Sequence, residues 1–121
     1  MPRNMSFAMT TEQVLEQSKT VTRRLGWGFL KPNDVLTAVE KSMGLKKGER
    51  AVKLRLIRIV SISGEPLNAI TQEDVIREGF PHWSPTQFVQ MMVDHYKVEP
   101  AVVVNRIEFD YIDSEQCKQM K

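Results

Sequence analysis

The sequence has one cysteine, two histidines and no apolar run long enough for a membrane helix. Because a single cysteine cannot form an intrachain disulfide, Cys117 is typical of a protein from a reducing compartment, and we expect a cytoplasmic location. A membrane helix needs about 20 apolar residues in a row, so we expect no membrane partner. The N-terminal residues 1–5 also lack the apolar core of a signal peptide.

The sequence also lacks the short motifs that mark common cofactor and metal sites. It has no pair of cysteines, no HExxH and no glycine-rich phosphate loop. His82 and His95 are too few and too separate for a metal site, and neither has an obvious nucleophile partner nearby in the sequence. We therefore expect no metal, no cofactor and no serine or cysteine triad.

Length and charge bound the organisation of the chain. With 121 residues we expect one domain over 1–112, followed by a polar tail over 113–121 that has no apolar periodicity and is expected to be disordered. Residues 1–58 hold 12 Lys and Arg against 5 Asp and Glu, whereas residues 59–121 hold 5 against 10. This asymmetry predicts a basic face for an anionic partner such as nucleic acid, unless the two halves interleave and cancel.

Hydrophobic periodicity predicts a few strands with three helices inserted. We expect strands over about 4–9, 19–25, 35–40, 52–62 and 102–112, and helices over 11–18, after Thr71 and after Ser84. The apolar parity switches within 52–62, which predicts a β-bulge near Leu56–Ile57 of the kind that bends a strand for barrel closure. This pattern predicts an α+β fold built on a small β-barrel with flanking helices.

Three helix starts carry local signals. Thr10 and Gln13 have the spacing of a capping box, and so do Ser84 and Gln87, with proline at the first helical position. Thr71 is the expected N-cap of the middle helix, inside a hydrophobic staple. In the last helix an apolar stripe recurs at helical spacing, and we expect core packing for its members: Phe88, Met91, Met92 and Tyr96.

The stretch from Lys19 to Leu25 packs one amine, two hydroxyls and two guanidiniums into seven residues. A solvated edge strand is the plain alternative. In an extended strand Thr22 and Arg24 share one face, so Lys19 reaches that face only if the chain bends beside it. An amine whose pKa is lowered by burial and by neighbouring arginines can act as base toward a hydroxyl. Glu78, at a helix end, is the candidate proton donor, with a surface glutamate as its alternative.

Four segments together resemble the ASCH-domain family of the PUA-like superfamily. They are residues 19–24, 31–36, 78–80 and 107–109, and the resemblance spans about Met5 to Ile112. Many ASCH domains have a Gly-x-Lys-x-x-Glu-x-Arg motif, which falls here on residues 17–24. Two positions depart from it, because Gln17 stands for the glycine and Thr22 for the glutamate.

The resemblance implies a PUA-like β-barrel with a cleft suited to RNA or a modified nucleoside. The threonine at position 22 is similar to that of the acetylcytidine amidohydrolase subgroup. That likeness implies Lys19 as general base, Thr22 as nucleophile and Glu78 as proton donor and acceptor, with Arg24 holding an oxygen of the substrate. We expect the following residues to contact the substrate or nucleic acid: Thr20, Arg23, Arg24, Trp27, His82 and Trp83.

Two other functions stay open on the sequence alone. The first is a non-catalytic RNA-binding module, in which the basic first half holds the backbone and Trp27 or Trp83 stacks on a base. The glycines on either side of Trp27 make it the better candidate for an exposed ring. The second is ribonucleolytic cleavage by Lys19 and Arg24, for which the sequence offers no clear acid–base pair. The oligomeric state is left open.

Overall fold

The computed structural model describes residues 3–41 and 52–112 of the chain. One five-stranded sheet, in the order β1-β3-β4-β5-β2, forms its frame. The pair β1·β3 is parallel and the other pairs are antiparallel. The strands are β1 (Arg3–Ser6), β2 (Val21–Arg24), β3 (Val35–Val39), β4 (Lys53–Pro66) and β5 (Val103–Ile112). The helices are η1 (Ala8–Thr10), α1 (Thr11–Leu15), η2 (Leu67–Ala69), α2 (Gln72–Arg77) and α3 (Pro85–Tyr96).

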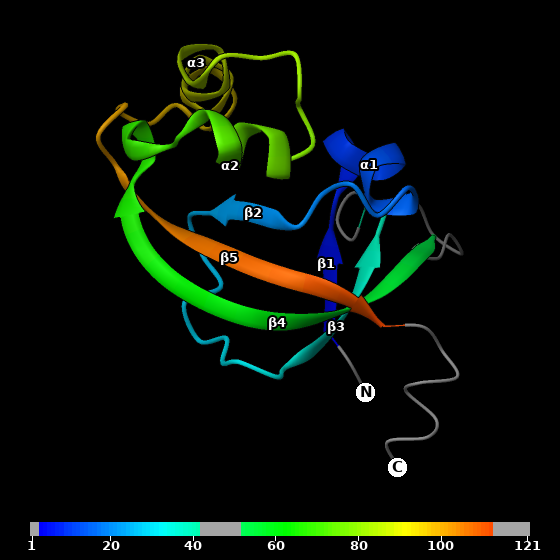
Figure 1. Ribbon diagram of the computed structural model, residues 1–121. Coiled ribbons are helices and arrows are strands. Elements are labelled where there is room, and N and C mark those ends of the chain that lie inside the picture. Colours follow the sequence, from blue (N-terminus) through cyan, green and yellow to red (C-terminus); the bar gives the residue numbers. More distant parts are fainter. Residues whose placement is uncertain (1–2, 42–51, 113–121) are drawn as a thin grey trace, which may run out of the picture.

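The sheet is strongly curled, and the long strands β4 and β5 carry most of the curvature (Figure 1). The helices α2 and α3 lie together at one end of these strands, while α1 lies near the start of β2. The curl brings the two edge strands β1 and β2 close together. The Arg24 side chain of β2 donates a 2.6 Å hydrogen bond to the Ser6 carbonyl of β1. The α+β class with a small curled barrel and flanking helices is thereby confirmed.

The apolar interior consists of two clusters. The first fills the curl of the sheet and is built from alternate residues of the strands, among them Ile57, Ile59, Ile107 and Phe109. The second lies between the helices and the ends of β4 and β5, where Leu67, Ile70, Val75, Phe88, Met92 and Val104 are buried. The buried polar residues Lys19, Thr22 and Glu78 line a pocket that contains members of both clusters.

The long strand β4 bends at other positions than the sequence predicts. The predicted bulge near Leu56–Ile57 is wrong, because that pair is in regular register with β3 and β5. The register against β5 shifts between Ile59 and Ser61 instead. Val60 is the extra residue there and is 42% exposed. The bulge returns Ile62 to the inner face, where it packs against the first cluster, so alternation alone mislocates the bend.

Two of the three predicted helix caps form as expected. The Ser84 hydroxyl accepts a hydrogen bond from the Gln87 amide at 3.2 Å, and the Gln87 side chain accepts one from the Ser84 amide at 2.8 Å. The Thr71 hydroxyl likewise accepts a hydrogen bond from the Asp74 amide. These caps fix the first turns of α3 and α2.

The predicted capping box at Thr10 is wrong. Its side chain makes no cap hydrogen bond, and Gln13 instead donates from Nε2 to the Gly79 carbonyl at 3.1 Å. This long-range bond ties α1 to the end of α2. Gly79 has φ +102°, and a Cβ there would lie 2.8 Å from Cγ of Gln13, so this position requires glycine.

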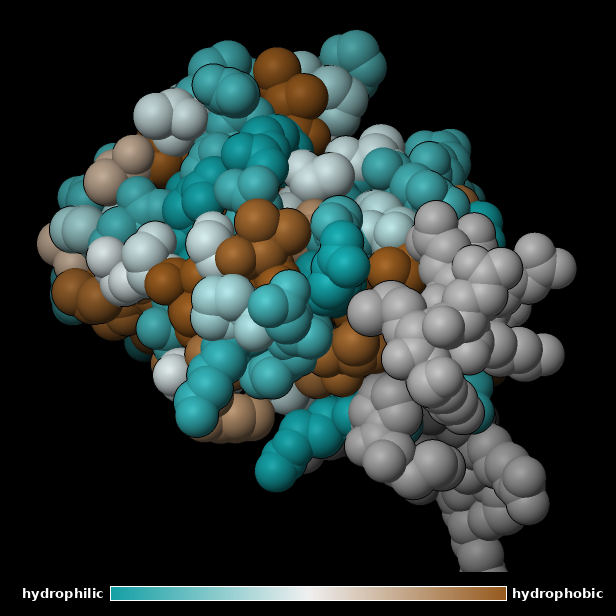
Figure 2. Space-filling view, turned by 60° about the horizontal axis from the view of Figure 1, so that its bottom comes forward, coloured by the Kyte–Doolittle hydropathy of each residue, from teal (hydrophilic) through white to brown (hydrophobic). Residues whose placement is uncertain are grey.

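The surface mixes polar and apolar side chains. Exposed apolar residues are spread over several elements, and the face in Figure 2 shows them as separate brown areas between teal ones. Within the described ranges no helix is long and apolar enough to cross a membrane. The tail predicted over 113–121 lies outside the described residues.

Candidate functional site

The chain bends at Lys19, immediately before β2. Gln17 has a left-handed backbone with φ +63°, and the amides of Ser18 and Lys19 both donate to the Gln13 carbonyl. The Thr20 amide then donates to the carbonyl of Arg77, the last residue of α2. This bend turns the Lys19 side chain inward, where the residue is only 3% exposed.

Lys19 meets Glu78 at the C-terminal end of α2. The ammonium nitrogen Nζ lies 2.7 Å from the carboxylate Oε1 of Glu78 and donates a second hydrogen bond, 2.8 Å long, to the backbone carbonyl of the same residue. Both side chains are almost completely buried. Burial lowers the pKa of Lys19, the Glu78 carboxylate opposes that shift, and the charges of Arg24 and Arg23 add to it.

Thr22 lies on the same wall of the site as Arg24. Arg24 donates from Nε to the Thr22 hydroxyl at 3.0 Å and from Nη2 to the Ser6 carbonyl. Its guanidinium carbon lies 4.9 Å from the centre of the Phe7 ring, a cation–π contact. Burial lowers the pKa of Arg24. Arg24 therefore joins the two edge strands and fixes the Thr22 hydroxyl.

A pocket of about 180 Å³ opens between these residues and α3. One wall is polar and contains Lys19, Thr22, Arg24 and Glu78. The opposite wall is mostly apolar and comes from Phe80 and from α3, including Met91, Met92, His95 and Tyr96. A cavity of about 150 Å³ holds one benzene ring, so this volume suits one ring of a ligand.

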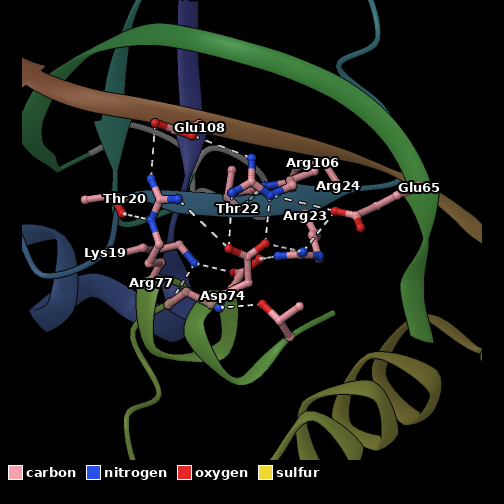
Figure 3. A network of polar contacts seen from close by, with 12 residues as sticks. Lys19, Thr20, Thr22, Arg23, Arg24, Glu65, Asp74, Arg77, Arg106 and Glu108 are labelled. Atoms are coloured by element: carbon pink, nitrogen blue, oxygen red, sulfur yellow. Dashed lines mark hydrogen bonds and ion pairs between the residues drawn. The ribbon is translucent and has the colours of Figure 1, made fainter. Parts of the chain in front are cut away.

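A network of ion pairs supports the polar wall from behind (Figure 3). Arg23, whose side chain is 1% exposed, donates to Glu78 at 3.2 Å, to Asp74 at 2.6 Å and to Glu65 at 3.0 Å. Arg106 donates two more hydrogen bonds to Asp74. The hydrogen bonds and charges of the two arginines lower the pKa of Asp74 to about 2, with Arg106 as the larger cause.

This network also pairs basic residues of the N-terminal half, residues 1–58, with acidic residues of the C-terminal half, residues 59–121. Arg23 of the basic half pairs with three carboxylates of the acidic half, and Arg58 pairs with Asp110 at 2.9 Å. The halves therefore interleave at these positions. Within the described residues, Nε of Arg23 is buried without a hydrogen-bond partner.

Four of the predicted ligand-binding residues lie away from this pocket. The hydroxyl of Thr20 accepts a hydrogen bond from Arg77 Nε at 3.1 Å. His82 is exposed on the loop before α3, and Trp83 is stacked on Phe80 with 4.3 Å between ring centres. The half-buried Trp27 lines a neighbouring hollow, described below.

Helix α3 lines the pocket, which the sequence does not predict. The sequence predicts core packing for the apolar stripe on this helix, and Phe88 and Met92 are indeed buried. Tyr96 is 43% exposed and, with Met91 and His95, faces the pocket. The one available signal was the polar neighbour His95 beside an apolar stripe. Among the described residues, no group of His, Cys, Asp and Glu is arranged to hold a metal ion.

Comparison with solved structures identifies the fold. The chain superposes on protein EF3133 from Enterococcus faecalis V583, of the DUF984 family, with a TM-score of 0.66 and 15% identity, over 98% of this chain and 82% of that one. An ASCH domain from Lactobacillus crispatus JV V101 gives a TM-score of 0.66 and 14% identity, over 90% and 78% of the two chains. ASCH from Zymomonas mobilis gives 0.58 and 10%, over 98% and 76%.

The chain therefore has the fold of ASCH-domain proteins, as the sequence motifs indicate. At these identities the likeness establishes the fold alone. No family model matches the sequence, and no curated protein matches it.

Proposed function

We propose that the pocket binds the base of a modified cytidine, and that Lys19, Thr22 and Glu78 hydrolyse its acetyl amide. The single observation that carries this proposal is the buried 2.7 Å contact between Lys19 and Glu78, on a pocket wall that also holds the Thr22 hydroxyl. The apolar wall from α3 suits one face of a planar ring, and the pocket volume suits one ring rather than a whole nucleoside. The sugar then remains outside.

The contact between Lys19 and Glu78 supplies a base and an acid together. Transfer of one proton from the ammonium to the carboxylate leaves a neutral amine and a protonated carboxyl group. Burial lowers the pKa of Lys19, which favours release of this proton from the ammonium. The amine then accepts the proton of the Thr22 hydroxyl while the oxygen attacks the carbonyl carbon of the acetyl group.

The remaining steps return every proton to its place. Glu78 gives its proton to the leaving amine nitrogen of cytidine, and an acetyl ester remains on Thr22. A water molecule attacks the ester, its proton passes to Glu78, and the ammonium of Lys19 returns a proton to the threonine oxygen. Acetic acid leaves and gives its proton to the solvent to become acetate, and the net reaction consumes one water. Nε of Arg24 lies 3.0 Å from the Thr22 hydroxyl oxygen. The guanidinium of Arg24 stabilises the negative charge that develops on the acetyl carbonyl oxygen when Thr22 attacks.

The test is release of cytidine and acetate from acetylcytidine by the purified protein. We expect Thr22→Val to abolish turnover, since it removes the hydroxyl and keeps the shape, and Thr22→Ser to retain part of it. Thr37→Val is the matched control, because Thr37 is a buried threonine of β3 outside the pocket. Full activity in Thr22→Val would exclude Thr22 as the nucleophile. Binding of the nucleoside without turnover would instead favour a non-catalytic module that recognises RNA.

A further inference from the structure

A second hollow adjoins the pocket. It lies beside the loop that follows β2, and its lining includes Leu25, Trp27 and Phe29 from that loop and Arg3 from β1. Arg24 and Tyr96 line both the hollow and the pocket, so the two share a wall. A ligand that occupies both the pocket and the hollow therefore lies against these two residues.

The hollow combines aromatic rings with positive charge. The ring centres of Trp27 and Phe29 are 5.5 Å apart, and the guanidinium carbon of Arg3 lies 5.0 Å from the centre of the Phe29 ring. Phe29 is 56% exposed and Leu25 is 45% exposed. Arginine is the charged residue type in this lining, and no carboxylate of the described chain belongs to it. Exposed rings with arginines around them are typical of surfaces on which bases stack and phosphates bind.

The loop that carries the rings is held in place. Trp27 has a left-handed backbone with φ +69°, which is unfavourable for a bulky residue. The conformation is supported from β5, where Asn105 donates from Nδ2 to the Gly26 carbonyl at 2.7 Å. The Leu30 amide also donates to the Trp27 carbonyl. A fixed platform loses little conformational entropy when a ligand binds.

We propose that this hollow binds the nucleotide next to the one in the pocket, so that the protein binds single-stranded RNA in preference to a free nucleoside. The neighbouring base stacks on Phe29 and Trp27, and the phosphate between the two nucleotides lies against Arg24 and Arg3. This inference rests on the proposed nucleobase pocket and adds the class of substrate to it. The charge of the hollow suits a phosphate better than it suits an uncharged peptide.

The probes are free acetylcytidine and a five-nucleotide RNA with acetylcytidine at its centre. We expect the wild-type protein to bind the RNA at least tenfold more tightly than the nucleoside. Phe29→Leu should weaken RNA binding about tenfold, in line with the loss of one stacked base, and change nucleoside affinity less than twofold. Arg3→Gln should reduce the salt dependence of RNA binding by about one phosphate contact.

Phe29→Leu is the preferred variant because Phe29 is exposed and the substitution leaves the core intact. Trp27 packs partly against the first cluster, so its substitution would disturb the core. Ile76→Ala is the control, an exposed apolar residue outside both cavities. Equal affinity for RNA and nucleoside, or an RNA affinity that Phe29→Leu does not change, would overturn this inference alone. Failure of the wild-type protein to bind either probe would overturn the nucleobase pocket itself and the inference with it.

Discussion

The ammonium nitrogen of Lys19 lies 2.7 Å from Oε1 of Glu78, and the two side chains are 4% and 3% exposed. The second carboxylate oxygen of Glu78 lies 3.2 Å from Nη1 of Arg23. A buried ion pair of this kind costs much of its attraction in lost hydration, so its presence says little about stability. Removal of one partner alone is strongly destabilising, because the charge of the other partner stays buried without compensation.

Replacing single members of this pair should therefore destabilise the protein unequally. Glu78→Gln leaves Lys19 and Arg23 without their shared carboxylate, and we expect a loss of about 3–5 kcal/mol in the free energy of unfolding. Lys19→Met should cost less, since Glu78 keeps its contact with Arg23. The double variant should be more stable than the sum of the two losses predicts.

Urea unfolding of the four proteins measures this coupling. Arg58→Met is the control, because Arg58 forms a 2.9 Å ion pair with Asp110 on the partly exposed side of the sheet. Its unfolding midpoint should hardly change, since exposed pairs contribute little. Strictly additive losses for Lys19→Met and Glu78→Gln would contradict a direct interaction between these side chains.

The titration of Lys19 gives a second prediction. Burial is the largest cause that lowers its pKa, and the positive charge of Arg24 adds to it, while Glu78 acts in the opposite direction. We expect the Lys19 side chain to titrate below its ordinary value of 10.5, and Arg24→Gln to move the midpoint upward. The measurement is an NMR titration of the lysine Cε resonances, with Lys19→Met to assign the signal.

Arg58→Gln is the matched control for this titration, since it removes an arginine outside the pocket. A wild-type midpoint at or above 10.5 would show that the attraction of Glu78 outweighs burial. The ammonium of Lys19 would then hold its proton, and the base assigned to Lys19 in the proposed reaction would fail.

The sequence predicts those parts of the fold that depend on neighbouring residues. The start of α3 is an example, because Ser84, Pro85 and Gln87 satisfy its first amides within four residues. Thr10 and Gln13 have the same spacing, yet Gln13 bonds to the Gly79 carbonyl, 66 residues away. A local rule fails there because a long-range partner competes for the same side chain.

The candidate site likewise has features that the local sequence predicts and features that depend on long-range packing. Strand parity places Thr22 with Arg24 and requires a bend at Lys19, and the chain has both features. The pairing of Lys19 with Glu78 depends on how α2 packs beside β2, which no spacing in the sequence encodes. The sequence does not predict the wall from α3 for a related reason, since an apolar stripe has the same pattern whether it packs against a core or lines a pocket.

Asp74 provides a prediction about stability and pH. Its carboxylate accepts hydrogen bonds from Arg23 at 2.6 Å and from Arg106 at 2.7 Å, and its pKa falls from 3.8 to about 2. Because the folded pKa lies below the unfolded one, this group stabilises the protein above about pH 4, and the contribution is lost as pH falls from 4 toward 2. The difference corresponds to about 2 kcal/mol.

In Asp74→Asn the unfolding free energy should therefore be lower at pH 6 and should fall less steeply from pH 4 to pH 2, as urea unfolding at each pH measures. Asp94→Asn, at an exposed position on α3, should keep the wild-type slope, and an equal slope in Asp74→Asn would refute the role assigned to the two arginines.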